Sequence, residues 1–254
     1  MPVKERRTKI LLLFFLIKDI SFEYLSFTPI LLKMFDLTLN QKTKGTLSSM
    51  LKDGSLEKKN NNEDSSNDDE LPLYKLTDQG FYELCLHFPA LRFVRDDWDG
   101  MWRIISYEIP EQKRHLRDRL RREMRGWGLG PWHRSFWVTA HPIIGALRDL
   151  VYGKEEEQYI QAFEATHMFG QMDILVEKVW EKTKLEKQYK ELFKFWHATL
   201  SKQNSKEDKL QEVVYEYIKT LRDDPGLPPS LVGKKWIGYE AFSIFKEMRG
   251  ILLS

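Results

Sequence analysis

The sequence predicts an α+β protein made of three successive parts, and three observations indicate this. Residues 1–92 combine short helical segments with two short strand-like segments, and residues 93–170 alternate strands with helices. Residues 171–254 carry the apolar spacing of long helices. With 254 residues, 42% of them hydrophobic, the chain is long enough to bury more than one core. We therefore expect three domains with boundaries after residues 92 and 170.

An apolar run, Ile10–Ile17, follows a basic start, as in a secretory signal peptide. Lys18 and Asp19 come directly after the run, there is no small-x-small cleavage pattern, and the run is too short to span a bilayer. We therefore expect a buried helix over residues 4–18 and no membrane partner, with a signal peptide as the alternative. The single cysteine, Cys85, excludes an internal disulfide and is typical of a reducing compartment, which predicts a cytoplasmic protein.

The order of elements in the N-terminal part is that of a winged helix-turn-helix. Asn40 is suited to cap a third helix over residues 41–52, and the segments SLEKK and LPLYKL then alternate like two strands. The polar, acidic tract at residues 60–70 joins these segments, and Thr77 is suited to cap the next helix. The tract is therefore expected at the tip of a wing, without ordered structure, and not in a linker between domains.

The third helix is the candidate for reading DNA, because it has an apolar side and a polar, basic side. A helix in the major groove needs polar side chains for the base edges and cations for the phosphates. The candidate DNA-binding residues are Gln41, Lys42, Lys44, Gly45, Ser48, Ser49 and Lys52 of the helix and Lys58, Lys59 and Lys75 at the base of the wing. The plain alternative is a solvated helix, but the position before a two-stranded wing favours DNA. The acidic tip would be repelled by phosphates and is not expected to touch them.

The central part predicts a ferredoxin-like unit. MWRIISYEIP, WHRSFWVTA and YIQAFEA have the pattern of strands, and EQKRHLRDRLRREMRGWGLG and residues 143–152 have the pattern of the helices between them. This β-α-β-α-β order is typical of a ferredoxin-like fold, with a fourth strand that the pattern does not locate. Further helices are expected in the C-terminal part, over residues 173–181, 184–200, 207–221 and 239–249.

The first helix of the central part carries a row of basic residues. The candidates for binding an effector or phosphate are Arg114, Arg117, Arg121 and Arg125. Such a row can bind DNA phosphates, an acidic ligand such as a coenzyme A thioester, or an acidic surface of a partner subunit. A solvated basic face is the plain alternative.

The sequence predicts no enzyme activity, no metal and no cofactor. Its six histidines are scattered, and it has neither a Gly-rich phosphate loop nor a Gly-x-Ser-x-Gly elbow. The alternative is a metal-dependent nuclease that uses Glu108, at the end of the first central strand. A second alternative is an interaction adaptor without DNA binding, which the acidic tract and the net charge of only +2 favour.

Two segments carry a resemblance to a known family. WDGMWRIISYEIPEQKRHLRDRLRREMRGWGLGPWHRSFWVTAHP resembles the central domain of the PaaX-type repressors of phenylacetic acid degradation, and DPGLPPSLVGKKWIGYEAFSIFKEM resembles their C-terminal signature. The resemblance implies a homodimeric repressor of transcription that binds double-stranded DNA and is released by an acyl-coenzyme A effector. It also implies a central domain similar to the small CRISPR-associated ferredoxin-like proteins. The family tends to have arginines along the third helix, where this sequence has Lys44 and Ser49, so its operator sequence is not carried over.

Overall fold

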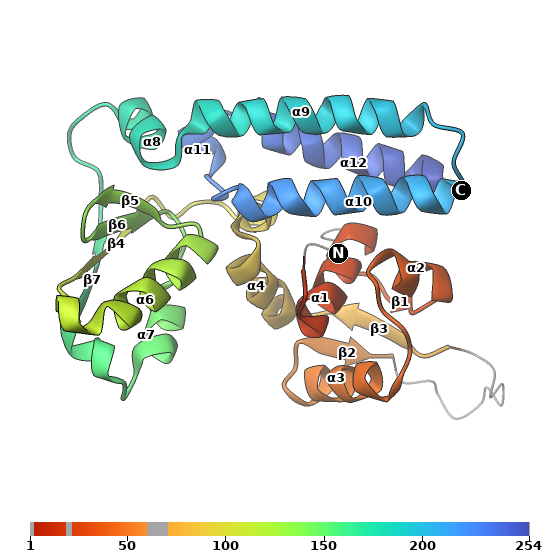
Figure 1. Ribbon diagram of the computed structural model, residues 1–254, viewed down its shortest axis with the longest axis horizontal. Coiled ribbons are helices and arrows are strands. Elements are labelled where there is room, and N and C mark those ends of the chain that lie inside the picture. The colour runs from red at the N-terminus through yellow and green to blue at the C-terminus, as the bar shows by residue number, and fades with distance from the viewer. Residues whose placement is uncertain (1–2, 19–21, 60–70, 254) are drawn as a thin grey trace. The chain divides into compact units, whose positions relative to one another are not determined.

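The structure is a computed structural model that describes residues 3–18, 22–59 and 71–253. Helices and strands follow one another along the chain in a mixed α+β arrangement (Figure 1). In order they are α1 (Arg6–Lys18), β1 (Leu25–Ser26), α2 (Pro29–Met34), α3 (Gln41–Lys52), β2 (Leu56–Lys58), β3 (Leu73–Leu76), α4 (Asp78–His87), α5 (Arg92–Arg95), β4 (Trp102–Tyr107), α6 (Arg114–Gly126), β5 (Gly130–His133), β6 (Phe136–Thr139), α7 (Ile144–Val151), β7 (Ile160–Ala165), α8 (Met172–Trp180), α9 (Lys182–Leu200), α10 (Lys206–Asp223), α11 (Pro229–Val232) and α12 (Ile237–Leu253).

The chain packs as two compact units. Unit 1 consists of residues 1–85, 192–219 and 243–254, and unit 2 consists of residues 86–191 and 220–242. Each unit thus joins segments that are distant in the sequence. The three-domain boundaries after residues 92 and 170 stay a prediction.

Helix α1 is buried in unit 1. Its residues Ile10–Leu16 are each at most 1% exposed. A helix that is apolar on all sides must be covered on all sides, and here the apolar run is covered completely. The predicted buried first helix is confirmed.

The sheet of unit 1 has the strand order β1-β3-β2, and both pairings are antiparallel. Leu56 of β2 pairs with Leu76 of β3, and both side chains are buried beneath the sheet. The predicted strands are therefore present, whereas the two-residue β1 was not expected because so short a segment shows no alternation. The acidic tract at residues 60–70 lies outside the described residues.

The C-terminal segments of unit 1 form a second apolar cluster beside α1. The indole of Trp196 donates to the backbone oxygen of Val213 at 3.2 Å, and its ring packs on Tyr217 and Phe245. The guanidinium of Arg249 donates to the carbonyl of Leu16 at the end of α1, at 2.8 Å. These contacts explain why the residues after 243 belong to the same compact unit as the N-terminus.

The sheet of unit 2 has the strand order β5-β6-β4-β7, with all neighbours antiparallel. Together with α6 and α7 it has the β-α-β-β-α-β order of a ferredoxin-like fold. The prediction of one strand for WHRSFWVTA was wrong, because the chain reverses at Arg134 and Ser135 and makes the two strands β5 and β6. Strand β5 is the fourth strand that the sequence pattern did not locate.

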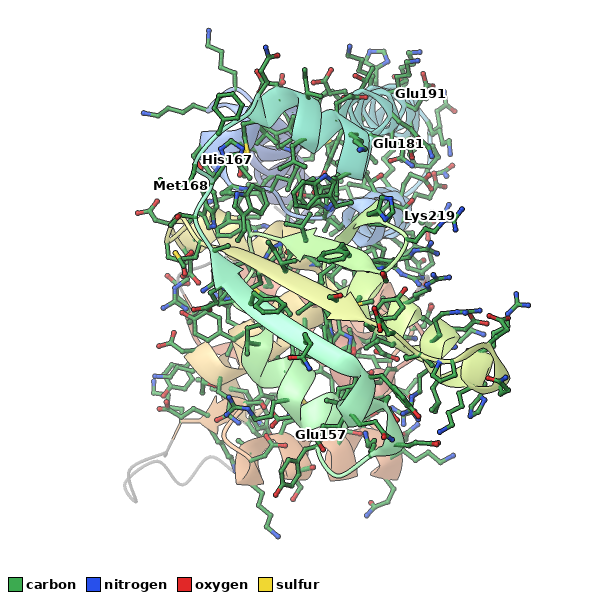
Figure 2. All side chains as sticks on the ribbon, turned by 90° about the vertical axis from the view of Figure 1, so that its left-hand side faces the viewer. Glu157, His167, Met168, Glu181, Glu191 and Lys219 are labelled. Carbon is green, nitrogen blue, oxygen red and sulfur yellow. The ribbon has the colours of Figure 1, made fainter. Side chains whose placement is uncertain are left out.

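Helices α6 and α7 cover one face of this sheet. Leu116, Leu120 and Met124 of α6 join Ile105 and Trp137 in a common core, as their spacing along the helix requires. The other face is only partly covered. Figure 2 looks toward β7, whose residues between Ile160 and Ala165 are all exposed, and labels Glu157 before the strand and His167 and Met168 after it.

Within the described residues, no helix is both long enough and apolar enough to cross a membrane.

Candidate nucleic-acid interface

Helix α3 turns its polar side outward. The seven exposed residues of the helix are Gln41, Lys42, Lys44, Gly45, Ser48, Ser49 and Lys52. Thr43, Leu47 and Met50 are buried and attach the helix to unit 1. Every helix residue that the sequence predicted as a DNA contact is therefore accessible, and all of them lie on one continuous side.

Both ends of α3 are secured by local hydrogen bonds. The Asn40 side-chain oxygen accepts from the Thr43 backbone N–H at 3.0 Å, as predicted for an N-cap. At the other end, the Asp53 backbone carbonyl accepts from the Gln79 amide at 2.7 Å. Gly80 lets α4 pass close to β2, because a Cβ there would lie 2.2 Å from the Ser55 carbonyl oxygen. The helix is thus held between its own caps and α4.

Arg7 of α1 makes several polar contacts to this region. Its guanidinium donates to Asp53 at 2.6 Å and to Ser55 at 2.6 Å, and it forms an ion pair with Glu83. The adjacent guanidinium holds the pKa of the Asp53 carboxyl down at about 2. One arginine therefore ties α1, the end of α3 and α4 together. Sequence reasoning missed it, since a basic residue at the start of an apolar helix carries no local sign of its distant partners.

The predicted wing lysines lie on two faces of the β2–β3 pair. Lys58 is opposite Tyr74 in the register, and side chains directly opposite share one face. Lys75 is on the other face, where it pairs with Glu57 at 3.0 Å. Lys59 lies on this second face as well, with its ammonium 6.0 Å from the centre of the Tyr24 ring. Because Glu57 offsets one charge, the second face is less basic than the count of lysines suggested.

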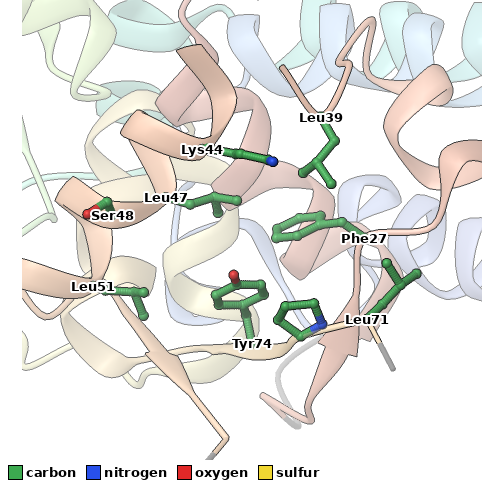
Figure 3. A pocket seen from close by; sticks show the side chains of 9 residues that line it. Phe27, Leu39, Lys44, Leu47, Ser48, Leu51, Leu71 and Tyr74 are labelled. Atoms are coloured by element: carbon green, nitrogen blue, oxygen red, sulfur yellow. The ribbon is translucent and has the colours of Figure 1, made fainter. Parts of the chain in front are cut away.

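A hollow of about 240 Å³ lies beside α3, and the sequence did not indicate it. Figure 3 shows it between Leu47 and Leu51 of α3 on one side and Phe27 and Tyr74 on the other. Lys44 and Ser48, two of the predicted DNA contacts, also line it. A pocket formed by residues from separate segments has no signature in any one of them.

The α6 arginines do not converge on one site. Arg117 pairs with Glu111 at 2.7 Å, Arg114 pairs with Asp118 at 3.5 Å, and Arg121 donates to the Tyr107 hydroxyl at 2.6 Å. The same carboxylates hold the pKa of the Arg117 guanidinium above its ordinary value, with the Glu111 hydrogen bond as the main cause. Most of the row is thus occupied by partners within the same domain, as on a solvated basic face.

Arg125, one of the predicted effector residues, lines a cavity. This cavity has a volume of about 310 Å³ and lies in unit 2 among α6, α8 and the end of α10. Arg222 also lines it, but so do Glu181, Asp223 and Asp224. Its mixed charge is a poor match for the phosphates of a coenzyme A thioester.

Glu108 is exposed, at the end of β4, where its backbone N–H donates to the Tyr159 carbonyl at 3.0 Å. Among the residues that the structure describes, no three histidine, cysteine, aspartate or glutamate side chains gather as a metal site would require. One histidine, His141, is completely buried, and burial lowers its pKa to about 4. Its Nε2 lies 2.7 Å from the Pro225 carbonyl oxygen, so the ring connects β6 to the segment after α10.

Two family models match this chain over most of its length after residue 94. Residues 95–175 match the model described as the PaaX protein central Cas2-like domain, and residues 180–254 match the PaaX-like protein C-terminal domain. The chain belongs to the PaaX-like family. The resemblance inferred from the sequence is confirmed, and the β4–β7 unit is the Cas2-like domain of this PaaX-like chain. Members of the family are in general transcriptional regulators.

Among solved structures, this PaaX-like chain is similar to the uncharacterized protein Rv0674 from Mycobacterium tuberculosis. The two are 16% identical, with a TM-score of 0.49, over 96% of this chain and 97% of that chain. No curated protein matches the PaaX-like chain.

Proposed function

We propose that the protein is a homodimeric transcriptional repressor in which unit 1 carries a winged helix-turn-helix. In this proposal α3 enters the major groove of double-stranded DNA. Lys58, on the face of the β2–β3 pair that also carries Tyr74, contacts the flanking phosphate backbone. Lys59 and Lys75 reach phosphates from the second face of the wing. Membership in a family of regulators supports the general role.

The observation that carries the proposal is the composition of the exposed side of α3. Its seven exposed residues include three lysines and no acid, and no acidic residue occurs anywhere in the helix. Gly45 stands in the middle of this side, and a Cβ there would have nothing within 4 Å. A glycine inside a helix lowers stability by roughly 0.5–1 kcal/mol relative to alanine. The packing of the chain does not require it, whereas a backbone that approaches DNA closely would.

The dimer and the effector are finer parts of the same proposal. A dimer places two copies of α3 on two half-sites, and a ligand that binds one arrangement better than the other changes their spacing. The family resemblance supports an acyl-coenzyme A as that ligand. Among the predicted arginines, Arg125 is exposed and lines a cavity, so it is the contact that this proposal assigns to the effector, although the acidic residues there weaken the match.

The test is DNA binding by a double variant of α3. DNA is first selected from a random pool with the full-length protein, and its affinity is then measured at several salt concentrations. Lys42→Glu with Lys52→Glu is expected to lower the affinity by at least about tenfold and to reduce the slope of log K against log salt by about 2, since two phosphate contacts are lost.

The matched control is Lys187→Glu with Lys190→Glu, which makes the same change in net charge at exposed positions of α9. If both double variants weaken binding equally, only the net charge matters and α3 is not the reading helix. If neither the wild type nor any variant binds DNA with salt-dependent affinity, the adaptor alternative replaces the repressor. Divalent-cation-dependent cleavage that Glu108→Gln abolishes would support the nuclease instead.

A further inference from the structure

The hollow beside α3 has the features of a small-molecule site. It lies entirely within unit 1, and apolar side chains make up most of its wall. These are Phe27, Leu39, Leu47, Leu51, Leu71, Pro72 and Tyr74. Leu39 and Leu71 are exposed, at 43% and 46%, so the hollow opens to solvent between them and the helix. Open apolar surface of this kind favours a ligand that removes it from water.

Two polar groups reach into this apolar space. Figure 3 shows the Lys44 ammonium extending from α3 toward Leu39 and the Tyr74 hydroxyl extending upward from β3 between Phe27 and Leu47. Among the described residues, neither the Lys44 ammonium nor the Tyr74 hydroxyl has an ion-pair or hydrogen-bond partner at contact distance. Burial alone raises the pKa of the Tyr74 hydroxyl, which is therefore a neutral donor at physiological pH.

The size and chemistry of the hollow limit its ligand. An apolar cavity of about 150 Å³ is enough for a benzene ring. At about 240 Å³ this one has room for a ring with a short chain, but not for the nucleotide part of coenzyme A. One cation and one hydroxyl donor at the edge of an apolar wall match a carboxylate on a compact hydrocarbon body.

We propose that the hollow binds a small carboxylate with an apolar body, whose carboxylate is held by Lys44 and Tyr74 and whose hydrocarbon lies against Phe27, Leu47 and Leu51. This site is separate from the cavity that Arg125 lines. Since Lys44 lies on the outward side of α3, a bound carboxylate also neutralises one of the cations assigned to DNA. The ligand therefore acts directly at the reading helix and weakens DNA binding, a consequence that rests on the proposed function.

The binding test uses 4-phenylbutyrate as the probe and 4-phenylbutan-1-ol as its neutral counterpart. Each is titrated into full-length protein labelled with ¹³C in the leucine methyl groups, without DNA. We expect saturable shifts at Leu39, Leu47, Leu51 and Leu71, with the acid bound at least about tenfold more tightly than the alcohol, because the charge-assisted contact is lost in the alcohol. Equal affinity for acid and alcohol, or shifts that avoid these leucines, would overturn the proposal.

Three variants separate the roles of the residues. Lys44→Met is expected to remove the preference for the acid, and Tyr74→Phe to weaken its binding about threefold. Lys42→Met, on the same helix but outside the hollow, is expected to leave ligand binding unchanged. Methyl spectra of the unliganded variants that match the wild type exclude misfolding as the cause, and a preference for the acid that survives Lys44→Met would contradict the assigned contact.

The effect of the ligand on DNA binding is measured separately. Saturating 4-phenylbutyrate is expected to weaken wild-type DNA binding several-fold and to reduce the salt slope by about 1, but to change nothing in Lys44→Met. Ligand binding without this effect would overturn the regulation and leave the site standing. If the protein binds no DNA at all, the proposed function fails, while the leucine shifts still decide whether the site exists.

Discussion

Arg7 is expected to be the most sensitive polar residue of unit 1, and Arg7→Met is the variant that tests this. The guanidinium connects α1 to Asp53 at the end of α3, to Ser55 before β2 and to Glu83 of α4. Methionine keeps much of the side-chain length but leaves the two carboxylates without their cation. We expect the orientation of α3 to loosen and unit 1 to lose stability.

The size of the effect follows from the two ion pairs. The pKa of Asp53 is lowered from 3.8 to about 2, mainly by Arg7 and in part by hydrogen bonds from Ser55, and the full difference of about 1.8 corresponds to roughly 2.4 kcal/mol. Because 40% of the Asp53 side chain is exposed, water screens the pair and about 1 kcal/mol remains. Glu83 is more buried, at 24% exposed, and losing its cation costs about 1–2 kcal/mol. The expected total is about 2–3 kcal/mol.

Hydrogen–deuterium exchange of the peptides that cover residues 41–59 measures this locally. The protection of these amides in Arg7→Met is expected to fall more than tenfold relative to the wild type, whereas Lys42→Met, at an exposed position of α3, should change it little. The Asp53 contribution is present above pH 3.8 and is lost as the pH falls toward 2, so wild type and Arg7→Met should become more alike in acid. If the amides of residues 41–59 are protected equally in the wild type and in Arg7→Met at neutral pH, the reasoning is refuted.

Three further predictions concern the caps, the helix surface and a buried histidine. Asn40→Ala should lower the free energy of unfolding of unit 1 by about 1 kcal/mol, seen as faster exchange in the first turn of α3. Gly45→Ala should stabilise α3 by about 0.5–1 kcal/mol, which slows its amide exchange, and yet weaken DNA binding. A Gly45→Ala variant that is more stable and binds DNA equally well would contradict the inference that the backbone approaches DNA closely there. His141 has its pKa lowered to about 4, so its neutral form contributes stability that is complete above about pH 6.5 and lost as the pH falls toward 4, by up to about 3 kcal/mol. Thermal unfolding of unit 2 followed by tryptophan fluorescence should show this loss between pH 6.5 and 4, and it should be absent in His141→Gln.

The local features of the fold could be read from the sequence with good accuracy. The limits of α3 were predicted to the residue because Asn40 caps its start and Gly54, with a φ of 81°, follows its end. The apolar repeat of α6 identified the face that packs on the sheet. Strand β5 was missed because Gly130 and Pro131 are typical of a loop, and only pairing with β6 makes that segment a strand.

In the candidate site, too, some features follow from the sequence and others only from the tertiary structure. Which residues of α3 face outward follows from the period of the helix, so all seven predicted contacts on it proved to be exposed. The partners of charged residues do not follow from any period. The pairing of Lys75 with Glu57, of Arg117 with Glu111 and of Arg7 with Glu83 depends on which segments fold against one another.

By itself, then, the sequence determined the longer helices, the cap at Asn40, the exposed side of α3 and the family of the chain, because each of these is encoded in neighbouring residues or in a contiguous motif. Only the tertiary structure decided which cations remain available, because a charge is neutralised by whatever the fold brings within a few ångströms of it. The same holds for the hollow beside α3. Its wall combines Phe27 and Tyr74 with Lys44, and no spacing along the chain foretells that these three side chains surround one space.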